Sequence, residues 1–398
     1  MEENILEILS FLKRNVKDLL TEDELKERLL KKKKLRVKLG IDVTGPDIHL
    51  GFAVVLRKLK EFQDFGHIAC LVIGDFTAKI GDPSGRSKVR PKLSDKEIKE
   101  NMKRYERQIF KILDKEKTEF YYNSSWHSKL RADEIIEITS KYTVARLLER
   151  DDFSKRYKNN LPIYVHEFLY PIFQAYDSIA IKADIELGGE DQYWNLLVGR
   201  ELMKEFNLEP QIVMTMPLLI GTDGKLKMSK SYNNYIGIEE DPKEMFGKIM
   251  SIPDELIIHY FQLCTNRKEE EIKEFEKRLK EGENPRDLKA QLAKDIVSIY
   301  HSEKEAEKAE EEFNRVFKYK ELPSEIPIYY SKEKNIRLVD LLVNANLLPS
   351  KSEAKRKIRE GGVYLNGERI FDIDYQVIID KEVVIKVGKR KFLKVLPL

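Results

Sequence analysis

The sequence contains few residues of several kinds, and each shortage excludes a class of protein. Only two cysteines occur among 398 residues, which excludes a small scaffold held together by disulfides. Cys70 and Cys264 lie in apolar stretches without metal-ligand spacing, so we expect reduced core residues of a cytoplasmic protein and no metal site. No apolar run approaches the length that crosses a bilayer, so no membrane partner is expected.

A strong overall charge is also missing, although one segment is distinctly basic. The formal net charge is only +3, with charged residues making up 35% of the chain. Residues 336–398 contain 13 lysines and arginines but only 8 aspartates and glutamates. The excess of positive charge therefore lies in this last segment, which predicts contact with a polyanion such as nucleic acid there.

The chain does contain a clear pattern, in which short strands alternate with long amphipathic helices. We expect an N-terminal helix over residues 1–20. The fold class predicted for residues 1–240 is α/β, a Rossmann-like nucleotide-binding parallel sheet with helices on both faces. A helical domain (241–320), a proline-containing linker (321–335) and a small α+β C-terminal module (336–398) are predicted to follow.

The stretch "GIDVTGPDIHLGF" is a candidate catalytic turn between a strand and a helix. Asp42 and Thr44 offer an acceptor and a hydroxyl group where the strand ends. His49 begins the helix, where backbone N–H groups favour anions. Gly51 leaves the helix surface open for a flat group such as a nucleoside. The alternative is a capped turn with a surface histidine.

A second stretch, "GKLKMSKS", places three lysines in one loop after a strand. Lys225, Lys227 and Lys230 suit a phosphate chain, because their ammonium groups can approach charge that builds on pyrophosphate. The alternative is an ordinary solvated basic loop. The order of a histidine turn followed about 180 residues later by Lys-Met-Ser-Lys-Ser resembles the two defining motifs of class I aminoacyl-tRNA synthetases.

Three further stretches narrow that resemblance. "YPIFQAYDS" places Tyr170, Gln174 and Asp177 on one face of an otherwise apolar helix, where acceptors can hold an α-amino group, although a plain amphipathic helix has the same pattern. "GGEDQYWN" and "IGDPSGR" add polar residues after glycine-containing turns. Together these stretches resemble the bacterial tyrosyl-tRNA synthetases over essentially the whole chain. The resemblance implies ATP-dependent activation of L-tyrosine and its transfer to tRNA(Tyr), Mg²⁺ with the ATP, and a homodimer formed through an insertion in the catalytic domain.

The resemblance also implies roles for individual residues. It gives a catalytic role around the departing pyrophosphate to His49, Thr44, Lys227, Lys230, Arg86 and Arg90. It gives substrate binding to Asp42, Asp82, Asn123, Tyr170, Gln174, Asp177 and Gln192, with Asp177 near the phenol group and Asn123 paired with Trp126 in the pocket wall. It gives ATP binding to Gly51, Phe52, Gly189, Asp191, Met228 and Ser229.

Two positions depart from the family pattern. Lys38 stands where the family often has a tyrosine that helps to bind the substrate phenol, so phenol recognition is expected to rest on Asp177 and other groups. Phe52 stands where the family usually has a second histidine near the nucleoside. We expect the Phe52 ring to pack against ribose or adenine, while His49 keeps its role at the pyrophosphate.

The basic C-terminal segment contains its own motif, "PSKSEAKRKIREGGVYLNGERI". Ser350 or Ser352 can cap a helix, and a basic stripe along that helix is predicted to bind RNA through phosphates and shape. Its residues are Lys351, Lys355, Arg356 and Arg359. Asn-Gly then predicts a hairpin. The segment is similar to a small RNA-binding module of a ribosomal small-subunit protein, although a solvated helix face has the same charges.

Two alternatives to tyrosine activation stay open at this point. A synthetase of the same class can act on tryptophan, although tryptophan-specific relatives usually lack the helix with Tyr170, Gln174 and Asp177 in this form. A synthetase-like RNA-binding protein that has lost activation is the other alternative. The presence of His49 and Lys230 argues against that alternative.

Overall fold

The computed structural model describes residues 2–31, 34–42, 47–81, 95–317, 326–388 and 391–398. The chain divides into two compact units, Met1–Ala309 and Glu310–Leu398, which are described separately. Among the described residues, no helix combines the length and the apolar character needed to span a bilayer.

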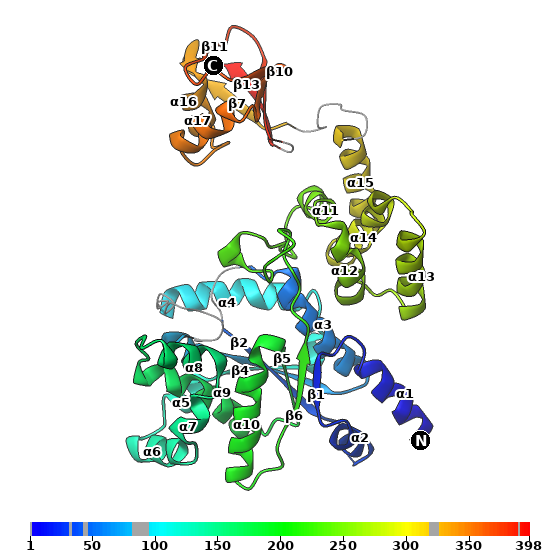
Figure 1. Ribbon diagram of the computed structural model, residues 1–398, viewed down its shortest axis with the longest axis vertical. Helices are drawn as coiled ribbons and strands as arrows, with labels where there is room; N and C mark the ends of the chain where they lie inside the picture. The colour runs from blue at the N-terminus through cyan, green and yellow to red at the C-terminus, as the bar shows by residue number, and fades with distance from the viewer. Residues whose placement is uncertain (1, 32–33, 43–46, 82–94, 318–325, 389–390) are drawn as a thin grey trace. The chain divides into compact units, whose positions relative to one another are not determined.

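The first unit is built on a six-stranded sheet with the order β1-β6-β5-β2-β3-β4 (Figure 1). Every neighbouring pair is parallel except β1 with β6. The strands are β1 (Asp18–Leu20), β2 (Arg36–Ile41), β3 (Ile68–Ile73), β4 (Thr118–Tyr122), β5 (Ile185–Gly189) and β6 (Ile212–Met216). The predicted Rossmann-like parallel sheet is confirmed.

Helices cover this sheet and continue beyond it. The chain steps from β2 to β3 in one direction and from β5 to β6 in the other, so right-handed crossovers place α3 and α10 on opposite faces. The helices are α1 (Glu2–Leu12), α2 (Glu22–Lys31), α3 (Leu50–Asp64), α4 (Asp95–Ile109), α5 (Ser124–His127), α6 (Ala132–Ser140), α7 (Val144–Leu147), α8 (Asp151–Lys158), α9 (Val165–Ile181), α10 (Tyr193–Glu205), α11 (Pro242–Met250), α12 (Ile257–Cys264), α13 (Glu269–Lys280), α14 (Pro285–Tyr300) and α15 (Glu303–Phe317). The predicted helical segment from residue 241 therefore forms, and up to Ala309 it belongs to the same compact unit as the sheet.

The prediction of one helix over residues 1–20 is wrong in its second half. Helix α1 ends at Leu12, and Asn15 turns the chain with a left-handed φ of 55°. Residues 18–20 then pair antiparallel with β6, and the Thr215 hydroxyl donates to the Asp18 carboxylate at 2.5 Å. Pairing with the otherwise open edge of β6 satisfies backbone groups that a longer helix would leave exposed at that edge.

The second unit is a small α+β module with a five-stranded sheet of order β10-β9-β12-β13-β7 and a β11-β8 pair. Leu338, Leu341, Ile358 and Ile385 are fully buried in its core. The elements are β7 (Ile328–Ser331), β8 (Asn335–Arg337), α16 (Leu338–Asn344), α17 (Lys351–Arg359), β9 (Val363–Leu365), β10 (Glu368–Ile370), β11 (Gln376–Ile378), β12 (Val383–Val387) and β13 (Lys391–Pro397).

Two sequence predictions concern this module, and the structure agrees fully with only one of them. Asn366 and Gly367 both have positive φ, 48° and 91°, in the turn between β9 and β10, so the predicted Asn-Gly hairpin is confirmed. Part of the predicted linker is structured, because β7 pairs parallel with β13 and extends the sheet. The exposed Pro327 and Tyr330 of this segment suit an edge strand as well as a linker, so composition alone did not separate the two.

Candidate active site

The histidine turn lies at the start of α3, as predicted. His49 is the N-cap residue, and its Nδ1 accepts a hydrogen bond from the backbone N–H of Phe52 at 3.3 Å. The backbone of His49 also forms an isolated bridge with Gly237. The stretch GKLKMSKS, residues 224–231, is called the lysine loop from here on. The start of α3 is therefore held by His49 itself and by the chain that follows the lysine loop.

The lysine loop lies directly against this turn. Lys230 Nζ donates to the backbone carbonyl of Asp47 at 2.7 Å and to the Tyr105 hydroxyl at 3.2 Å. The N–H of Gly51 lies 3.4 Å from the Met228 sulfur, and a Cβ at Gly51 would meet both His49 Nδ1 and Met228 Cβ within 3.3 Å. Glycine thus favours the close approach of two motifs that lie about 180 residues apart in the sequence, because a larger residue would push His49 or Met228 aside.

His49, Lys227 and Lys230 lie in one corner of the site, and the electrostatics of this corner keep the His49 imidazole uncharged. Burial and, to a smaller extent, the positive charges of Lys230 and Lys227 together lower its pKa to about 4. An uncharged ring agrees with the hydrogen bond to Phe52, because Nδ1 must carry a lone pair to accept it. The corner therefore presents lysine cations and a neutral imidazole together.

This pKa predicts a pH dependence of stability. The unfolded chain protonates His49 at an ordinary pKa near 6.5, whereas the folded chain does so only near 4. Stability is therefore lost as the pH falls from 6.5 towards 4, by about 1–2 kcal/mol between pH 7 and pH 5. Urea unfolding of His49→Asn, which keeps a capping acceptor, is expected to lack this component, and an unchanged pH dependence would contradict it.

A second contact joins the lysine loop to the end of β5. Lys227 Nζ forms an ion pair with Asp191 Oδ2 at 2.6 Å. A Cβ at Gly189 would lie 2.8 Å from Asp191 Oδ1, so glycine lets this carboxylate lie close to the strand end. The Ser229 backbone N–H donates to Asn234 Oδ1 at 2.8 Å, which holds the loop in this position.

The predicted polar face of α9 is confirmed, and it meets the end of β2. The Tyr170 hydroxyl donates to Asp42 Oδ2 at 2.7 Å, and Thr77 Oγ1 lies 3.4 Å from Asp42 Oδ1. A side chain at Gly74 would collide with both Asp42 and Thr77. The carboxyl ends of β2 and β3 thus meet at Asp42, which Tyr170 of α9 also contacts, as expected for a site in a parallel sheet.

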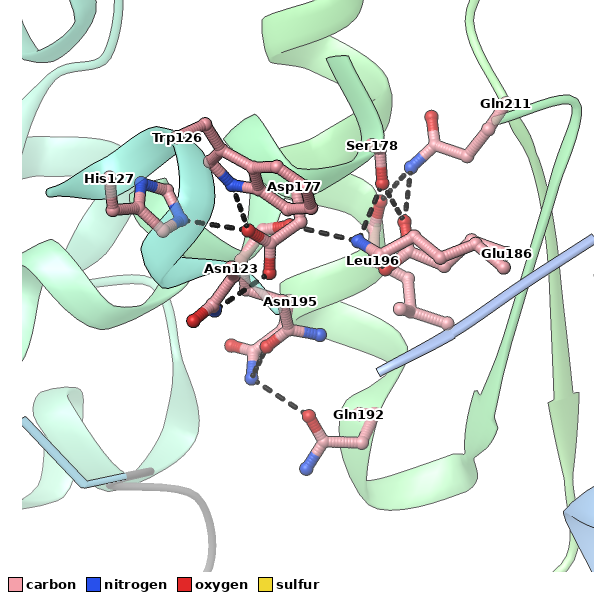
Figure 2. Close-up of polar contacts among 12 residues, drawn as sticks. Asn123, Trp126, His127, Asp177, Ser178, Glu186, Gln192, Asn195, Leu196 and Gln211 are labelled. Carbon is pink, nitrogen blue, oxygen red and sulfur yellow. Dashed lines mark hydrogen bonds and ion pairs between the residues drawn. The ribbon is translucent and has the colours of Figure 1, made fainter. Parts of the chain in front are cut away.

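Asn195 connects two of the predicted substrate ligands (Figure 2). Its Nδ2 donates to Gln192 Oε1 at 3.0 Å and to Gln174 Oε1 at 3.3 Å. Its Oδ1 accepts from Arg150 Nη1 at 3.1 Å. The amide oxygens of both glutamines therefore face Asn195, which sets the orientation of both carboxamides.

Three side chains surround the carboxylate of Asp177 (Figure 2). Oδ1 accepts from Trp126 Nε1 at 2.9 Å and contacts His127 Nε2 at 2.7 Å, and Oδ2 accepts from Asn123 Nδ2 at 3.3 Å. Asp177 is only 4% exposed and Asn123 is fully buried. The structure thus brings the two predicted pocket residues, Asn123 and Trp126, to the carboxylate of Asp177, together with a histidine that was not predicted.

Lys38 lies in a buried ion pair. Its Nζ donates to Glu186 Oε1 at 2.8 Å, to Ser178 Oγ at 2.7 Å and to the backbone carbonyl of Gln174 at 2.9 Å. An ammonium group has three N–H donors, so all of them are used. Glu186 Oε2 in turn accepts from Ser178 and from Gln211 Nε2. Lys38 thus ties α9 to the sheet.

Several residues of this site were not predicted from the sequence, and some predicted ones lie outside the described ranges. Gly74, Thr77, His127, Glu186 and Asn195 were not predicted. Their signals were weak, because a glycine after a strand or a single polar residue in a helix has many ordinary explanations. Four predicted residues lie outside the described part of the chain: Thr44, Asp82, Arg86 and Arg90.

In the second unit, the predicted basic stripe lies on α17. The Ser350 hydroxyl caps this helix by accepting from the backbone N–H of Glu353 at 3.2 Å. Lys351 pairs with Asp340 at 2.7 Å, and Arg356 lies 3.5 Å from Glu353. All four basic residues of the stripe are exposed, namely Lys351, Lys355, Arg356 and Arg359.

Comparisons with known families cover both units. The family model described as "tRNA synthetases class I (W and Y)" matches residues 30–318, and the one described as "Tyrosine--tRNA ligase SYY-like C-terminal domain" matches residues 318–395. The tyrosine–tRNA ligase of Thermotoga maritima is 57% identical over 391 residues, which cover 98% of this chain and 97% of that protein. That of Aquifex aeolicus is 50% identical over 389 residues and 98% of each chain.

Solved structures agree at the level of the fold. A tyrosyl-tRNA synthetase from Archaeoglobus fulgidus, complexed with L-tyrosine, has a TM-score of 0.63 and 24% identity over 77% of this chain and 99% of that chain. A truncated mitochondrial tyrosyl-tRNA synthetase from Aspergillus nidulans has a TM-score of 0.65 and 22% identity over 80% of this chain and all of that chain. The matches to the family models and to the full-length relatives together show that the chain belongs to the bacterial tyrosyl-tRNA synthetases.

Proposed function

We propose that the residues gathered around α9, the start of α3 and the lysine loop carry out the tyrosine–tRNA ligase reaction of this family. In that reaction L-tyrosine and ATP give tyrosyl-adenylate and pyrophosphate, and the tyrosyl group then passes to the 3′ end of tRNA(Tyr). The observation that carries the proposal is the contact of Met228 and Lys230 with the turn from Asp47 to Gly51.

For the amino acid, we assign the polar face of α9 and its partners. Tyr170 and Gln174 offer oxygen atoms to the α-amino group, Gln192 lies near the carboxylate, and Asp177 accepts the phenol hydroxyl. Asp42 lies between the amino acid and the nucleotide. The hydrogen bonds from Tyr170 to Asp42 and from Asn195 to both glutamines support this arrangement, because they fix the ligands before substrate binds.

For the first chemical step, we propose catalysis by position and charge. A tyrosine carboxylate oxygen attacks the α-phosphorus of ATP, and the bond from that phosphorus to the bridging oxygen of pyrophosphate breaks. Negative charge therefore grows on pyrophosphate, where Lys227, Lys230 and the neutral His49 are assigned to stabilise it. No side chain needs to become covalently attached to the substrate. Roles for Thr44, Asp82, Arg86 and Arg90 stay predictions from the sequence.

ATP binding is proposed to change one contact of the site. Asp191 is assigned to the ribose and Lys227 to the phosphates, yet the two side chains form an ion pair at 2.6 Å. A nucleotide that uses both must separate them. Separating them costs little free energy, because the Lys227 side chain is 36% exposed and the Asp191 side chain 28% exposed. Mg²⁺ is proposed to enter with ATP, whose phosphate oxygens suit it.

We also propose a homodimer, supported by exposed apolar side chains between residues 136 and 165. Six large ones in this segment are more than half exposed: Ile136, Val144, Tyr157, Leu161, Tyr164 and Val165. Exposed apolar groups of this size favour burial against another surface, and in a two-fold dimer the same segment of both chains meets.

The cytoplasm is the proposed location, since both cysteines are buried free thiols.

The transfer step is tested by changing the basic stripe on α17. Replacing Lys355, Arg356 and Arg359 together by glutamate is expected to lower kcat/KM for tRNA charging by about 10²-fold or more at low salt, because phosphate contacts dominate RNA affinity. ATP–pyrophosphate exchange with tyrosine is expected to change less than about twofold, because this step uses no RNA. The control is Lys381→Glu, which reverses the charge of an exposed lysine in the same unit outside the stripe. Equal losses in both assays would contradict a separate RNA module.

A further inference from the structure

The recognition of the tyrosine hydroxyl group has to be achieved without Lys38. All three of its N–H donors are engaged by Glu186, Ser178 and the carbonyl of Gln174, and the side chain is fully buried. Nothing of this ammonium remains to meet a phenol group. On the proposed function, therefore, the carboxylate of Asp177 has to distinguish tyrosine from phenylalanine.

The two oxygens of Asp177 differ in how many donors they already have (Figure 2). Among the described residues, Oδ1 has two partners, Trp126 Nε1 at 2.9 Å and His127 Nε2 at 2.7 Å, whereas Oδ2 has only the longer contact of 3.3 Å with Asn123. Each carboxylate oxygen accepts about two hydrogen bonds. Oδ2 therefore has the capacity to accept one more hydrogen bond.

All three donors come from one short segment. Asn123 precedes α5, and Trp126 and His127 lie in its single turn. The turn is anchored by Asp75, whose carboxylate accepts from the backbone N–H of Ser124 at 2.9 Å and from its hydroxyl at 2.6 Å. Positions three and four residues after Asn123 thus bring their side chains to the same carboxylate.

The surroundings of His127 determine which of its nitrogens carries the hydrogen. Its ring centroid lies 4.9 Å from that of Phe173, 5.2 Å from that of Phe76 and 5.8 Å from that of Tyr176. Nδ1 is buried without a hydrogen-bond partner among the described residues. A hydrogen on Nδ1 would be an unpaired buried donor, so the hydrogen belongs on Nε2, where it is donated to Asp177.

We propose that His127 is a positioning residue for the selection of tyrosine, because its Nε2–H holds Oδ1 of Asp177 so that Oδ2 accepts the substrate hydroxyl. Asp177 is 4% exposed, so water does not replace a donor that is lost. Without His127 only Trp126 restrains Oδ1, and the carboxylate can turn away from the hydroxyl. Phenylalanine has no hydroxyl and gains nothing from this restraint.

The test compares tyrosine and phenylalanine in ATP–pyrophosphate exchange with full-length protein. His127→Leu fills a similar volume without a donor, and it is expected to lower kcat/KM for tyrosine about 10–100-fold, the usual range for a hydrogen bond to a charged group. The value for phenylalanine is expected to stay within about threefold, so the tyrosine preference falls by between about threefold and about 300-fold. His127→Gln, whose Nε2 can donate from a similar place, is expected to restore most of the preference.

A control separates positioning from packing. Phe173→Leu disturbs the same aromatic group and leaves every donor to Asp177 in place, so it is expected to lower Tm and to keep the tyrosine preference within about twofold. Parallel losses for both amino acids in His127→Leu, an unchanged preference, or no recovery in His127→Gln would overturn the inference. Wild-type protein without tyrosine-dependent exchange would instead contradict the proposed function, so the two failures are distinguishable.

Discussion

Replacing Lys230 by alanine is expected to slow the formation of tyrosyl-adenylate about 10²–10³-fold, the usual cost of removing one group that stabilises charge in a transition state. Lys230 donates to the Asp47 carbonyl and lies beside His49, whose pKa it helps to lower. Its ammonium is therefore in the corner assigned to pyrophosphate. The Kd for tyrosine, measured by equilibrium dialysis, is expected to change less than about twofold, since tyrosine is assigned to the α9 side of the site.

Lys225 in the same loop offers a matched control for this measurement. Its side chain is exposed, and although its charge would suit a phosphate chain, the family resemblance assigns roles to Lys227 and Lys230 and none to Lys225. Lys225→Ala is expected to keep the rate of adenylate formation within about twofold, because an exposed lysine contributes little where water screens its charge. Equal rates for Lys230→Ala and wild type in rapid-quench measurements would show that the loop does not stabilise the departing pyrophosphate.

Replacing Lys38 by methionine is expected to destabilise the fold by about 3–5 kcal/mol. The Glu186 side chain is 2% exposed, so the substitution leaves a buried carboxylate without its cation. Gln211 and Ser178 still donate to this carboxylate, but neither supplies a charge. Urea unfolding followed by circular dichroism measures the difference in the free energy of unfolding.

Two further variants identify the cause of this loss. Lys38→Met combined with Glu186→Gln removes both charges and is expected to recover part of the stability, because no unpaired buried charge remains. Lys60→Met breaks the exposed pair of Lys60 with Asp64, whose side chains are 36% and 56% exposed, and is expected to cost less than about 0.5 kcal/mol. A Lys38→Met protein within about 1 kcal/mol of wild type would show that the buried pair does not stabilise the fold.

Much of the architecture could be predicted from periodicity and local chemistry. The strand Ile68–Ile73 is a continuous apolar run, which is typical of a buried parallel strand. The helix with Tyr170, Gln174 and Asp177 places its polar groups on one face because helical spacing alone dictates it. The N-terminal edge strand was missed, since its three residues form a strand only by pairing with β6.

The site was predictable where a residue has a distinctive neighbourhood in the sequence, and not where its role depends on tertiary packing. His49 and Lys230 belong to motifs whose order is informative by itself. Asn195 and His127 become meaningful only after folding, when one bridges two glutamines and the other reaches Asp177. Lys38 is the strongest example, because only the structure shows that its charge is paired with Glu186 and unavailable to a substrate.

ATP–pyrophosphate exchange with tyrosine, tryptophan and phenylalanine, each at saturating ATP, tests the central claim most directly. The account predicts rapid exchange with tyrosine, no detectable exchange with tryptophan, and exchange with phenylalanine reduced by several orders of magnitude. A site that hydrogen-bonds a hydroxyl is known to reject phenylalanine by about 10⁵-fold in this very enzyme type. Exchange with tryptophan and none with tyrosine would contradict the account.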